Sequence, residues 1–392
     1  MSANMSARRP CSSGTLIRKA CILALSVVMM AVAGRSFATQ LREKEPVVVG
    51  PGVSRVARLS DYFERLKGSP ADTPVYVMEG SEEGGSTLII AGDHPNEISG
   101  TLSCIMLIES GAVLKGRVFL IPFANESAFT VSHPGEATPA RYHIQTPWGV
   151  RWFRFGDRWT NPLHQWPDPE VYSHYPSGQS LSGFDVRNLN RCYPGKPNGA
   201  LTEQVGYAVA ELIPQEEIDL TIDLHEAEPM YPIINTIVSH QNAVDIGVIA
   251  AMDLATEEGI QIGNEISPVK LHGLAHRELG DYTNSLVLLA ETCNPIQDPC
   301  RGRTDETLLL TGKDEFILKA YNLGLLYVPY DEHGSPVDER VGRSNSTILR
   351  LIASFSDLYP EREIVVSGFP RMAEVMERGV GAYLQNPDDA TR

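Results

Sequence analysis

Residues 86–122 constrain the fold of this 392-residue chain more than any other stretch. Residues 86–91 are an apolar run, residues 96–110 carry apolar side chains at helical spacing, and residues 117–122 are a second apolar run. The helical pattern stops at Gly111, a residue type that commonly ends helices. Strand, helix and strand at this spacing predict a βαβ unit. We therefore expect an α/β fold with a mixed, mostly parallel central sheet flanked by helices.

The turn between the first strand and the helix carries an imidazole and a carboxylate three residues apart, His94 and Glu97. Zinc accepts both ligand types, and a catalytic zinc site keeps three protein ligands and one open position. Ligand sites of open α/β sheets lie at the carboxyl ends of strands, where His94 stands. An H-x-x-E pair also arises by chance in many proteins. The pair gains weight only if neighbouring strand ends supply further groups.

Two more predicted strand ends supply such groups. His225 follows the apolar run 218–224, and Asp223 lies on the same face of that strand, where it can orient the imidazole. Glu291 ends the buried run 285–290, whose apolar neighbours should raise its pKa and suit it to general acid–base catalysis. Taken singly, each residue has a structural explanation, such as a backbone-bonded histidine or a solvated carboxylate. Their recurrence at strand ends is what indicates a site.

A fourth motif reads N-L-N-R-C-Y-P-G over residues 188–195. A guanidinium presents a fork that matches a carboxylate, and a neighbouring amide adds a directional hydrogen bond. Asn190 and Arg191 therefore favour a clamp for the anionic end of a substrate. The alternative is a turn before the helix predicted to start at Leu201.

The first 38 residues have the layout of a secretory signal peptide. Basic residues precede an apolar run over residues 20–34, and Ser36-Phe37-Ala38 offers a small-x-Ala cleavage site. The alternative is an uncleaved membrane anchor, but the run is shorter than the roughly 20 residues of a spanning helix. We expect cleavage after Ala38, a periplasmic or secreted location, and no stable membrane insertion of the mature chain.

Removing that leader takes five of the 33 basic residues and none of the 49 acidic ones, which leaves 28 basic residues and a net charge of −21. Such a charge repels nucleic acid and anionic lipid, so we expect neither as a partner. The cysteines outside the leader include no C-x-x-C pair, which argues against a cysteine-bound zinc. Cys293 and Cys300 form a disulfide in one interpretation and a reduced pair in the other.

The rest of the chain divides by pattern. Residues 39–70 read as a polar surface segment, residues 71–330 as the catalytic domain, and residues 331–392 as a helical tail packed on that domain. Within the domain, residues 125–184 break the strand–helix alternation and hold all four tryptophans. A long aromatic insertion is usually functional. We expect it to form a wall of the substrate pocket or, alternatively, a structural flap on the core.

The motifs H-x-x-E, N-x-N-R-x-Y-P-G, D-L-H and a later strand-end Glu occur in this order over residues 86–300. Together they resemble the zinc carboxypeptidase superfamily, and most of all its succinylglutamate desuccinylase/aspartoacylase branch. The resemblance implies one zinc ion per chain and assigns three roles. The implied zinc ligands are His94, Glu97 and His225. The implied general base is Glu291, and the implied carboxylate clamp is Asn190 with Arg191.

The resemblance also raises questions that the sequence leaves open. Members of the branch use a further arginine to polarise the substrate carbonyl; Arg187 is the nearest candidate, and the insertion offers Arg151, Arg154 and Arg158. Tyr282 is a candidate for the tyrosine that carboxypeptidases place before the catalytic Glu. The chain departs from the branch at Pro95 and Asn188, where Gly and Asp are frequent, and in its tail, which reads helical rather than β-rich.

These observations predict an exported zinc-dependent hydrolase that cleaves an amide bond next to a carboxylate-bearing group, first of all an N-acyl amino acid deacylase. A metallocarboxypeptidase acting on peptides or cell-wall muropeptides is the alternative. A non-catalytic exported binding protein on the same fold is an alternative of another class, and the intact ligand set and Glu291 argue against it. The expected partner is a small molecule or peptide with a free carboxylate. The sequence leaves the oligomeric state open.

Overall fold

The computed structural model describes residues 13–132, 138–297 and 304–389, and the chain separates into two compact units, Met1–Glu43 and Lys44–Arg392. The described part of the first unit is mainly one apolar helix, α1 (Ser13–Arg42), with 30 residues. By length and composition α1 is able to cross a membrane, as signal sequences also are. The helix is longer than the apolar run seen in the sequence, so length does not separate a leader from an anchor. Cleavage after Ala38 remains a prediction.

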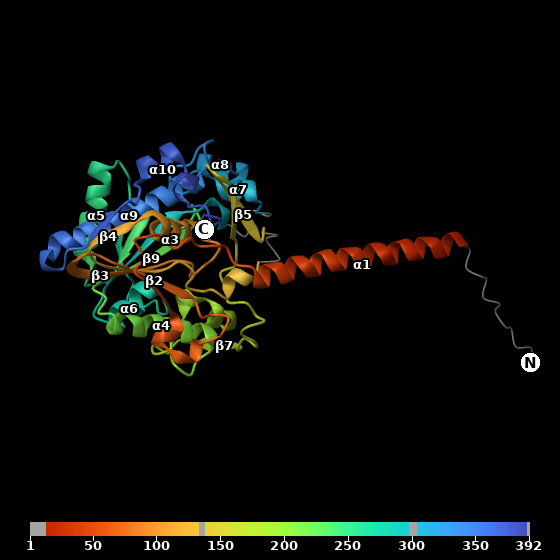
Figure 1. Cartoon of the computed structure of the whole chain (residues 1–392), viewed down its shortest axis with the longest axis horizontal. Coiled ribbons are helices and arrows are strands. Elements are labelled where there is room, and N and C mark those ends of the chain that lie inside the picture. The colour runs from red at the N-terminus through yellow and green to blue at the C-terminus, as the bar shows by residue number, and fades with distance from the viewer. Residues whose placement is uncertain (1–12, 133–137, 298–303, 390–392) are drawn as a thin grey trace, which may run out of the picture. The chain divides into compact units, whose positions relative to one another are not determined.

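A mixed sheet forms the centre of the second unit, as predicted (Figure 1). Its spatial order is β1-β2-β4-β3-β9-β12-β10-β11, with β13 paired to the first part of β4. The middle strands β4, β3, β9 and β12 run parallel, and antiparallel pairs flank them. The strand bounds are β1 Arg55–Arg58, β2 Pro74–Glu79, β3 Glu82–Ile90, β4 Ala112–Ile121, β9 Leu220–Ala227, β10 Thr236–Ser239, β11 Gly263–Ile266, β12 Leu286–Cys293 and β13 Val365–Ser367.

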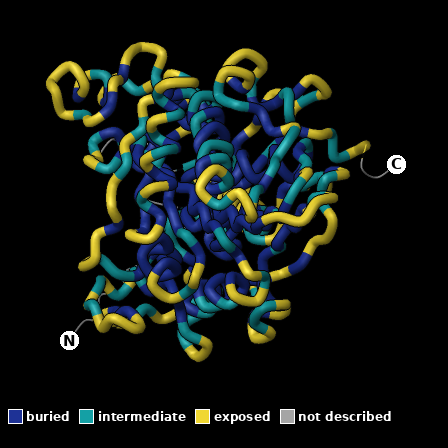
Figure 2. Tube along the Cα trace, turned by 90° about the vertical axis from the view of Figure 1, so that its left-hand side faces the viewer, coloured by how far each residue is buried: buried dark blue, intermediate teal, exposed yellow. Residues whose placement is uncertain are grey.

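Helices cover both faces of this sheet (Figure 1). One face packs against α3 (Ile98–Ser110), α5 (Val244–Glu257), α9 (Val337–Leu358) and α10 (Met372–Arg378), and the other against α2 (Leu59–Tyr62), α4 (Leu201–Gln215) and α6 (Ala275–Tyr282). Two short helices, α7 (Glu306–Thr311) and α8 (Glu315–Asn322), precede the tail. The buried core runs through the middle of the unit, while exposed residues lie mostly at turns (Figure 2).

The strands contribute alternate residues to these two cores. In β3, Ile89 packs into the core beneath α3, whereas Leu88 and Ile90 pack into the core beneath α4. This alternation follows from the two-residue period of a strand. Because both faces are covered, the central strands are apolar on both sides, which explains why they read as continuous hydrophobic runs.

Residues 44–70 and the tail, which lie outside the predicted catalytic domain, belong to the same compact unit as that domain. The segment 39–70 contributes β1 to the sheet, and the tail contributes α9 and β13. The tail is therefore not purely helical as predicted: β13 precedes the short helix α10 and the 3-10 helix η7 (Val380–Tyr383). Cys300, the partner of Cys293 in the predicted disulfide, lies outside the described residues.

The insertion 125–184 is built from two hairpins, β5–β6 (Arg141–Thr146 and Gly149–Arg154) and β7–β8 (Val171–Ser173 and Ser180–Ser182). Two of its arginines are buried in ion pairs with glutamates of other segments. Arg151 binds Glu109 at 2.6 Å, and Arg154 binds Glu126 at 2.8 Å and also Glu45. These pairs attach the first hairpin to the body of the unit.

Candidate metal and catalytic site

The chain reverses sharply between β3 and α3 and so places His94 at the sheet's carboxyl end. Gly92 has a φ of +74°, and a Cβ there would lie 2.8 Å from the carbonyl oxygen of Pro122. Only glycine accommodates both the left-handed conformation and that close approach. The turn closes with a hydrogen bond from the Glu97 amide to the His94 carbonyl, 2.9 Å long. His94 and Glu97 therefore face the same space.

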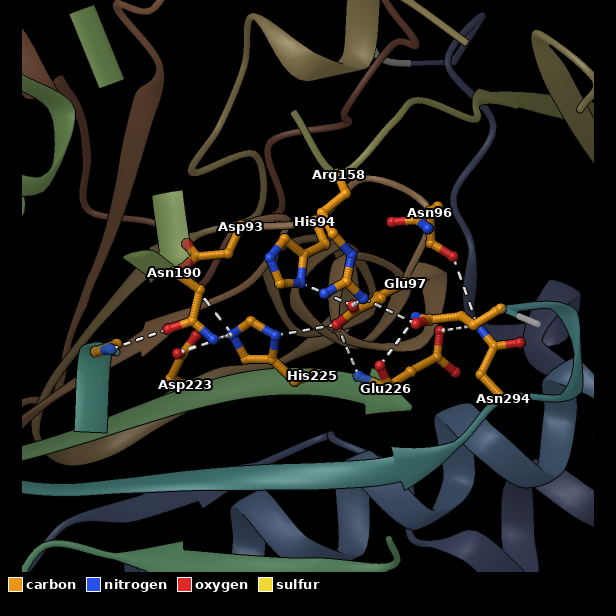
Figure 3. A network of polar contacts seen from close by, with 12 residues as sticks. Asp93, His94, Asn96, Glu97, Arg158, Asn190, Asp223, His225, Glu226 and Asn294 are labelled. Atoms are coloured by element: carbon orange, nitrogen blue, oxygen red, sulfur yellow. Dashed lines mark hydrogen bonds and ion pairs between the residues drawn. The ribbon is translucent and has the colours of Figure 1, made fainter. Parts of the chain in front are cut away.

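Three side chains converge there (Figure 3). His94 Nδ1 lies 2.7 Å from Glu97 Oε1, and His225 Nδ1 lies 3.0 Å from Glu97 Oε2. The two imidazoles meet edge to face, with ring centroids 4.9 Å apart. The three predicted metal ligands are thus brought together, and each is at most 4% exposed.

The outer nitrogen of each imidazole is held by an oxygen acceptor. His94 Nε2–H donates to Asn188 Oδ1 at 2.8 Å, and His225 Nε2–H donates to Asp223 Oδ2 at 2.9 Å. Both rings therefore present Nδ1 to Glu97. Metal-binding histidines typically have such a second partner, which fixes the tautomer and the ring orientation. The predicted role of Asp223 is supported, and Asn188, noted from sequence only as a departure, fills the equivalent position behind His94.

Charges inside this cluster shift its pKa values. Burial, together with the nearby Arg158 and His225, lowers the pKa of His94 to about 4 against the opposing effect of Glu97. Burial also disfavours protonation of His225, but the carboxylates of Asp223 and Glu97 outweigh it and raise its pKa well above 6.5. Burial raises the pKa of Glu97, but the two imidazoles lower it well below 4.5 overall. Glu97 is therefore an anion poised between two imidazole nitrogens.

These residues fit a zinc ion. One ligand atom from each of His94, Glu97 and His225 lies within 4.8 Å of the others, and nitrogen and carboxylate oxygen are ligands that zinc prefers. Both Nδ1 atoms are free of backbone partners among the described residues and point at the carboxylate. Three such ligands leave room for one exchangeable position.

Glu291 stands beside this cluster because of the sheet register. In the parallel pair of β9 and β12, Glu291 lies directly opposite His225, so both side chains leave the sheet on the same face. Both residues lie within their strands, two residues before the last, rather than after the strand end as the sequence predicted. Burial, reinforced by the nearby Glu97 and opposed by His225, raises the pKa of Glu291 to about 8.

A cavity of about 210 Å³ opens over these groups. Asn190 and Arg191 line it, as predicted for a substrate clamp, together with Arg158, Tyr231 and His276. The Asn190 amide oxygen accepts a hydrogen bond of 3.0 Å from the Ala275 amide. Burial, with the nearby Arg158 charge, lowers the pKa of Arg191. An arginine pair in a small cavity is a favourable site for an anion.

Of the four arginine candidates, the structure brings one to the cavity. Arg158 NH2 lies 3.0 Å from Glu97 Oε1 and 2.9 Å from Gln297 Oε1. Arg187 instead forms a bidentate pair with Asp168, at 2.8 and 2.9 Å, and does not line the cavity. Arg151 and Arg154 are committed to the buried pairs described above. Tyr282 is also elsewhere: it lies at the end of α6 and is 52% exposed.

Glu226, the residue after His225, connects the site to the tail. Its amide donates to Glu97 Oε2 at 2.8 Å, and its carboxylate Oε1 lies 3.1 Å from NH1 of Arg340, in the first turn of α9. Asn294 Nδ2 donates to the other carboxylate oxygen at 3.2 Å. Glu226 and Arg340 are each 1% exposed. A buried charge this close to the ligands needs its partner, since an unpaired ion in the interior is strongly destabilising.

Fold and site together define an α/β protein with a three-ligand candidate metal centre and a neighbouring glutamate. No protein-family model and no curated protein matches the chain. Among solved structures it is similar to an aspartoacylase family protein from Mesorhizobium loti, with 19% identity, a TM-score of 0.35, and coverage of 57% of this chain and 56% of that one.

Two further solved structures are similar in the same way. A succinylglutamate desuccinylase from Silicibacter sp. has 15% identity and a TM-score of 0.36, with 66% of this chain and 63% of that one covered. A metallo-carboxypeptidase from Burkholderia cenocepacia has 12% identity and a TM-score of 0.43, with 84% and 69% covered. The chain covers less than two thirds of the length of the aspartoacylase family protein and the desuccinylase. The activity of this chain is therefore inferred from its own residues.

Proposed function

We propose that the chain is an exported zinc-dependent hydrolase that cleaves an amide bond adjacent to a carboxylate-bearing group. The observation that carries the proposal is the convergence of His94, Glu97 and His225, with ligand atoms within 4.8 Å of one another and Glu291 next to His225 in the sheet register. A three-ligand set is typical of catalytic zinc, whereas structural zinc is closed by four ligands.

The chemistry divides between the ion and the chain's own residues. A bound zinc ion would polarise the substrate carbonyl and acidify a water molecule. Glu291 would accept the proton of the attacking water and transfer it to the leaving amine. Its pKa of about 8, raised mainly by burial, suits a group that must both take and return a proton near neutral pH.

Substrate orientation would fall to the cavity wall. Arg191 and Arg158 both line the cavity, and their two positive charges repel each other. A substrate carboxylate between them would offset that repulsion and leave the scissile amide facing Glu291. Asn190, whose amide nitrogen lies 3.4 Å from His225 Nε2, would supply a further donor at the boundary between clamp and ligands.

The size of the cavity favours a small substrate. Its volume of about 210 Å³ lies below the roughly 300–1,000 Å³ typical of sites for drug-sized ligands. An N-acyl amino acid fits this scale better than a long peptide does, so deacylation is preferred over carboxypeptidase action. The apolar helix α1 supports export, which would also give access to cell-wall peptides, so the peptide substrates are included as competitors in the test.

The test combines metal analysis with a substrate panel. Purified protein should hold a zinc ion that His94→Ala removes, and should hydrolyse N-acyl amino acids faster than dipeptides or muropeptides. Glu291→Gln should keep that ion but lower kcat by about 10²–10⁴-fold, the range for loss of a general base. Failure of the wild type to bind zinc through His94 would overturn the proposal. Zinc binding with no turnover in any assay would support the alternative of a non-catalytic binding protein.

A further inference from the structure

A second group of metal-ligand residues lies outside the site described above. His174 comes from the β7–β8 hairpin of the insertion, His272 from the loop before α6, and Glu278 from α6 itself. One nitrogen or carboxylate oxygen from each lies within 4.8 Å of the others. The two imidazoles stack with centroids 5.8 Å apart and an interplanar angle of 22°, and His272 Nδ1 lies 2.7 Å from Glu278 Oε1.

The hydrogen bonds around this group resemble those around a ligated histidine. His174 Nε2–H donates to the carbonyl of Tyr193 at 2.6 Å, which leaves Nδ1 without a proton. Nδ1 accepts a hydrogen bond of 2.7 Å from the Ser177 hydroxyl, a bond that a metal ion at Nδ1 would replace. A backbone carbonyl behind a histidine is one of the partners that fix the tautomer of metal-binding imidazoles.

The chemistry of the group matches that of the first cluster. Both consist of two imidazoles and a glutamate, and in both the glutamate lies 2.7 Å from a histidine Nδ1. The second group also has a path for an ion to enter, because the His272 side chain is 28% exposed, whereas His94 is 3% exposed. Glu278 is held in place by the Gly273 amide at 3.0 Å.

We propose that His174, His272 and Glu278 bind a second divalent transition-metal ion, distinct from the one at His94. Imidazole and carboxylate ligands suit zinc, cobalt, nickel and copper rather than magnesium or calcium. The ion would fasten the β7–β8 hairpin to the loop of residues 268–274. That loop supplies Leu271 and Leu274 to the cavity wall, so the ion would fix part of the substrate site without touching the reacting groups.

The test isolates the second site by blocking the first. Metal-free His94→Ala protein is titrated with Co²⁺, whose visible absorption reports coordination by protein ligands, and bound metal is measured after gel filtration. We expect one equivalent in His94→Ala and none in His94→Ala/His272→Ala. The matched control His94→Ala/His333→Ala removes an exposed histidine far along the sequence and should keep the full equivalent.

A rescue variant separates ligation from packing. In His94→Ala/His272→Cys a thiolate replaces the imidazole, and bound Co²⁺ should then show sulfur-to-metal charge-transfer absorption, which a purely structural role for His272 does not produce. Absence of Co²⁺ binding in His94→Ala, or an unchanged spectrum in His94→Ala/His272→Ala, overturns the inference. Either result leaves the proposed function intact, because that function depends on the ion removed by His94→Ala.

Discussion

The metal-ligand half of the candidate site is carried by strands and a tight turn, whereas the half that would contact substrate is carried by loops and short helices. His94, Glu97 and His225 are buried, and the Nε2 atoms of both histidines are held by hydrogen bonds to neighbouring side chains. Arg158 and Tyr231 come from irregular segments and are 29% and 40% exposed. Rigid elements thus hold the candidate metal ligands, whereas more exposed segments hold groups that would contact substrate.

The largest effect should come from breaking the charge pair beneath the rigid half. Arg340→Met leaves the Glu226 carboxylate buried without its partner and should cost about 3–5 kcal/mol in the free energy of unfolding, measured by urea denaturation. Arg343→Met, one turn along α9, removes an i,i+4 pair with Glu339 that is partly exposed and should cost less than about 1 kcal/mol.

Two results decide this case. The double variant Glu226→Gln/Arg340→Met removes both charges and should regain much of the lost stability, because no isolated buried ion remains. Arg340→Met could instead lower the free energy of unfolding by no more than Arg343→Met does. That result would show that the tail does not support the strand that carries His225.

The next effect concerns the loop half. Arg158→Ala should lower kcat/KM by about 100-fold, since it removes a charge that faces both Glu97 and the substrate space. Arg187→Ala loses a pair with Asp168 away from the cavity and should change kcat/KM by about twofold or less. Steady-state kinetics on the best substrate from the panel measure both. Equal losses for the two arginines would contradict the placement of Arg158 as the active-site arginine.

The rigid half should also show a pH dependence in metal binding. Because the pKa of His225 is raised well above 6.5 in the metal-free protein, zinc must displace a proton from this ring near neutral pH. Zinc affinity should therefore rise by about tenfold per pH unit until His225 deprotonates. Calorimetry in buffers of different ionisation enthalpy measures the proton released. Asp223→Asn should lower that pKa and flatten the dependence, and an unaltered slope would count against the assignment.

The raised pKa of His225 also affects the stability of the metal-free protein. A histidine whose pKa is raised on folding stabilises the metal-free protein fully below its unfolded pKa of about 6.5. That contribution is lost as the pH rises through the folded pKa of His225. Metal-free protein should therefore lose this share of its stability above neutral pH, and Asp223→Asn should lose it at lower pH.

The smallest effect should come from the loop tyrosine. Tyr231→Phe keeps the ring but removes a hydroxyl whose pKa is raised by burial and by the nearby Glu291. A hydrogen bond of ordinary strength to substrate, about 1 kcal/mol, corresponds to roughly fivefold in kcat/KM. Tyr282→Phe, outside the cavity, is the control and should match wild type. A larger loss of kcat/KM for Tyr282→Phe than for Tyr231→Phe would contradict the assignment of Tyr231 to the substrate cavity.

The contrast between the two halves also explains what the sequence could predict. Apolar runs and helical periodicity predict the positions of β3, α3, β9 and β12. Because parallel strands end at one edge of a sheet, the sequence also predicts that His94, His225 and Glu291 lie close together. These inferences succeeded because strand pairing leaves little freedom. The ends of β9 and β12 were placed too early, since polar His225 and Glu291 interrupt the apolar pattern but not the strands.

Loop-borne residues were beyond the same reasoning. Arg187 is nearest in sequence to the Asn190-Arg191 motif, yet its guanidinium forms an ion pair with Asp168. Arg158, which belongs to the insertion, instead contacts Glu97 in the site. Tyr282 precedes Glu291 in sequence, but the cavity is lined by Tyr231 instead. No local pattern marks Arg340 as buried, because its partner Glu226 lies 114 residues away. Long-range contacts of this kind leave no periodic signal.

The position of Arg340 has a consequence for the order in which the molecule is completed. During synthesis all three metal ligands and Glu291 emerge from the ribosome before residue 340 does. Until then Glu226 lacks its counter-charge, so burying the Glu226 carboxylate in the strand that bears His225 is unfavourable. A chain truncated ahead of α9 would keep His94, Glu97, His225 and Glu291 but would lose the counter-charge of Glu226. The 53 residues from Arg340 onward therefore have to be present before Glu226 can be buried with its counter-charge beside His225.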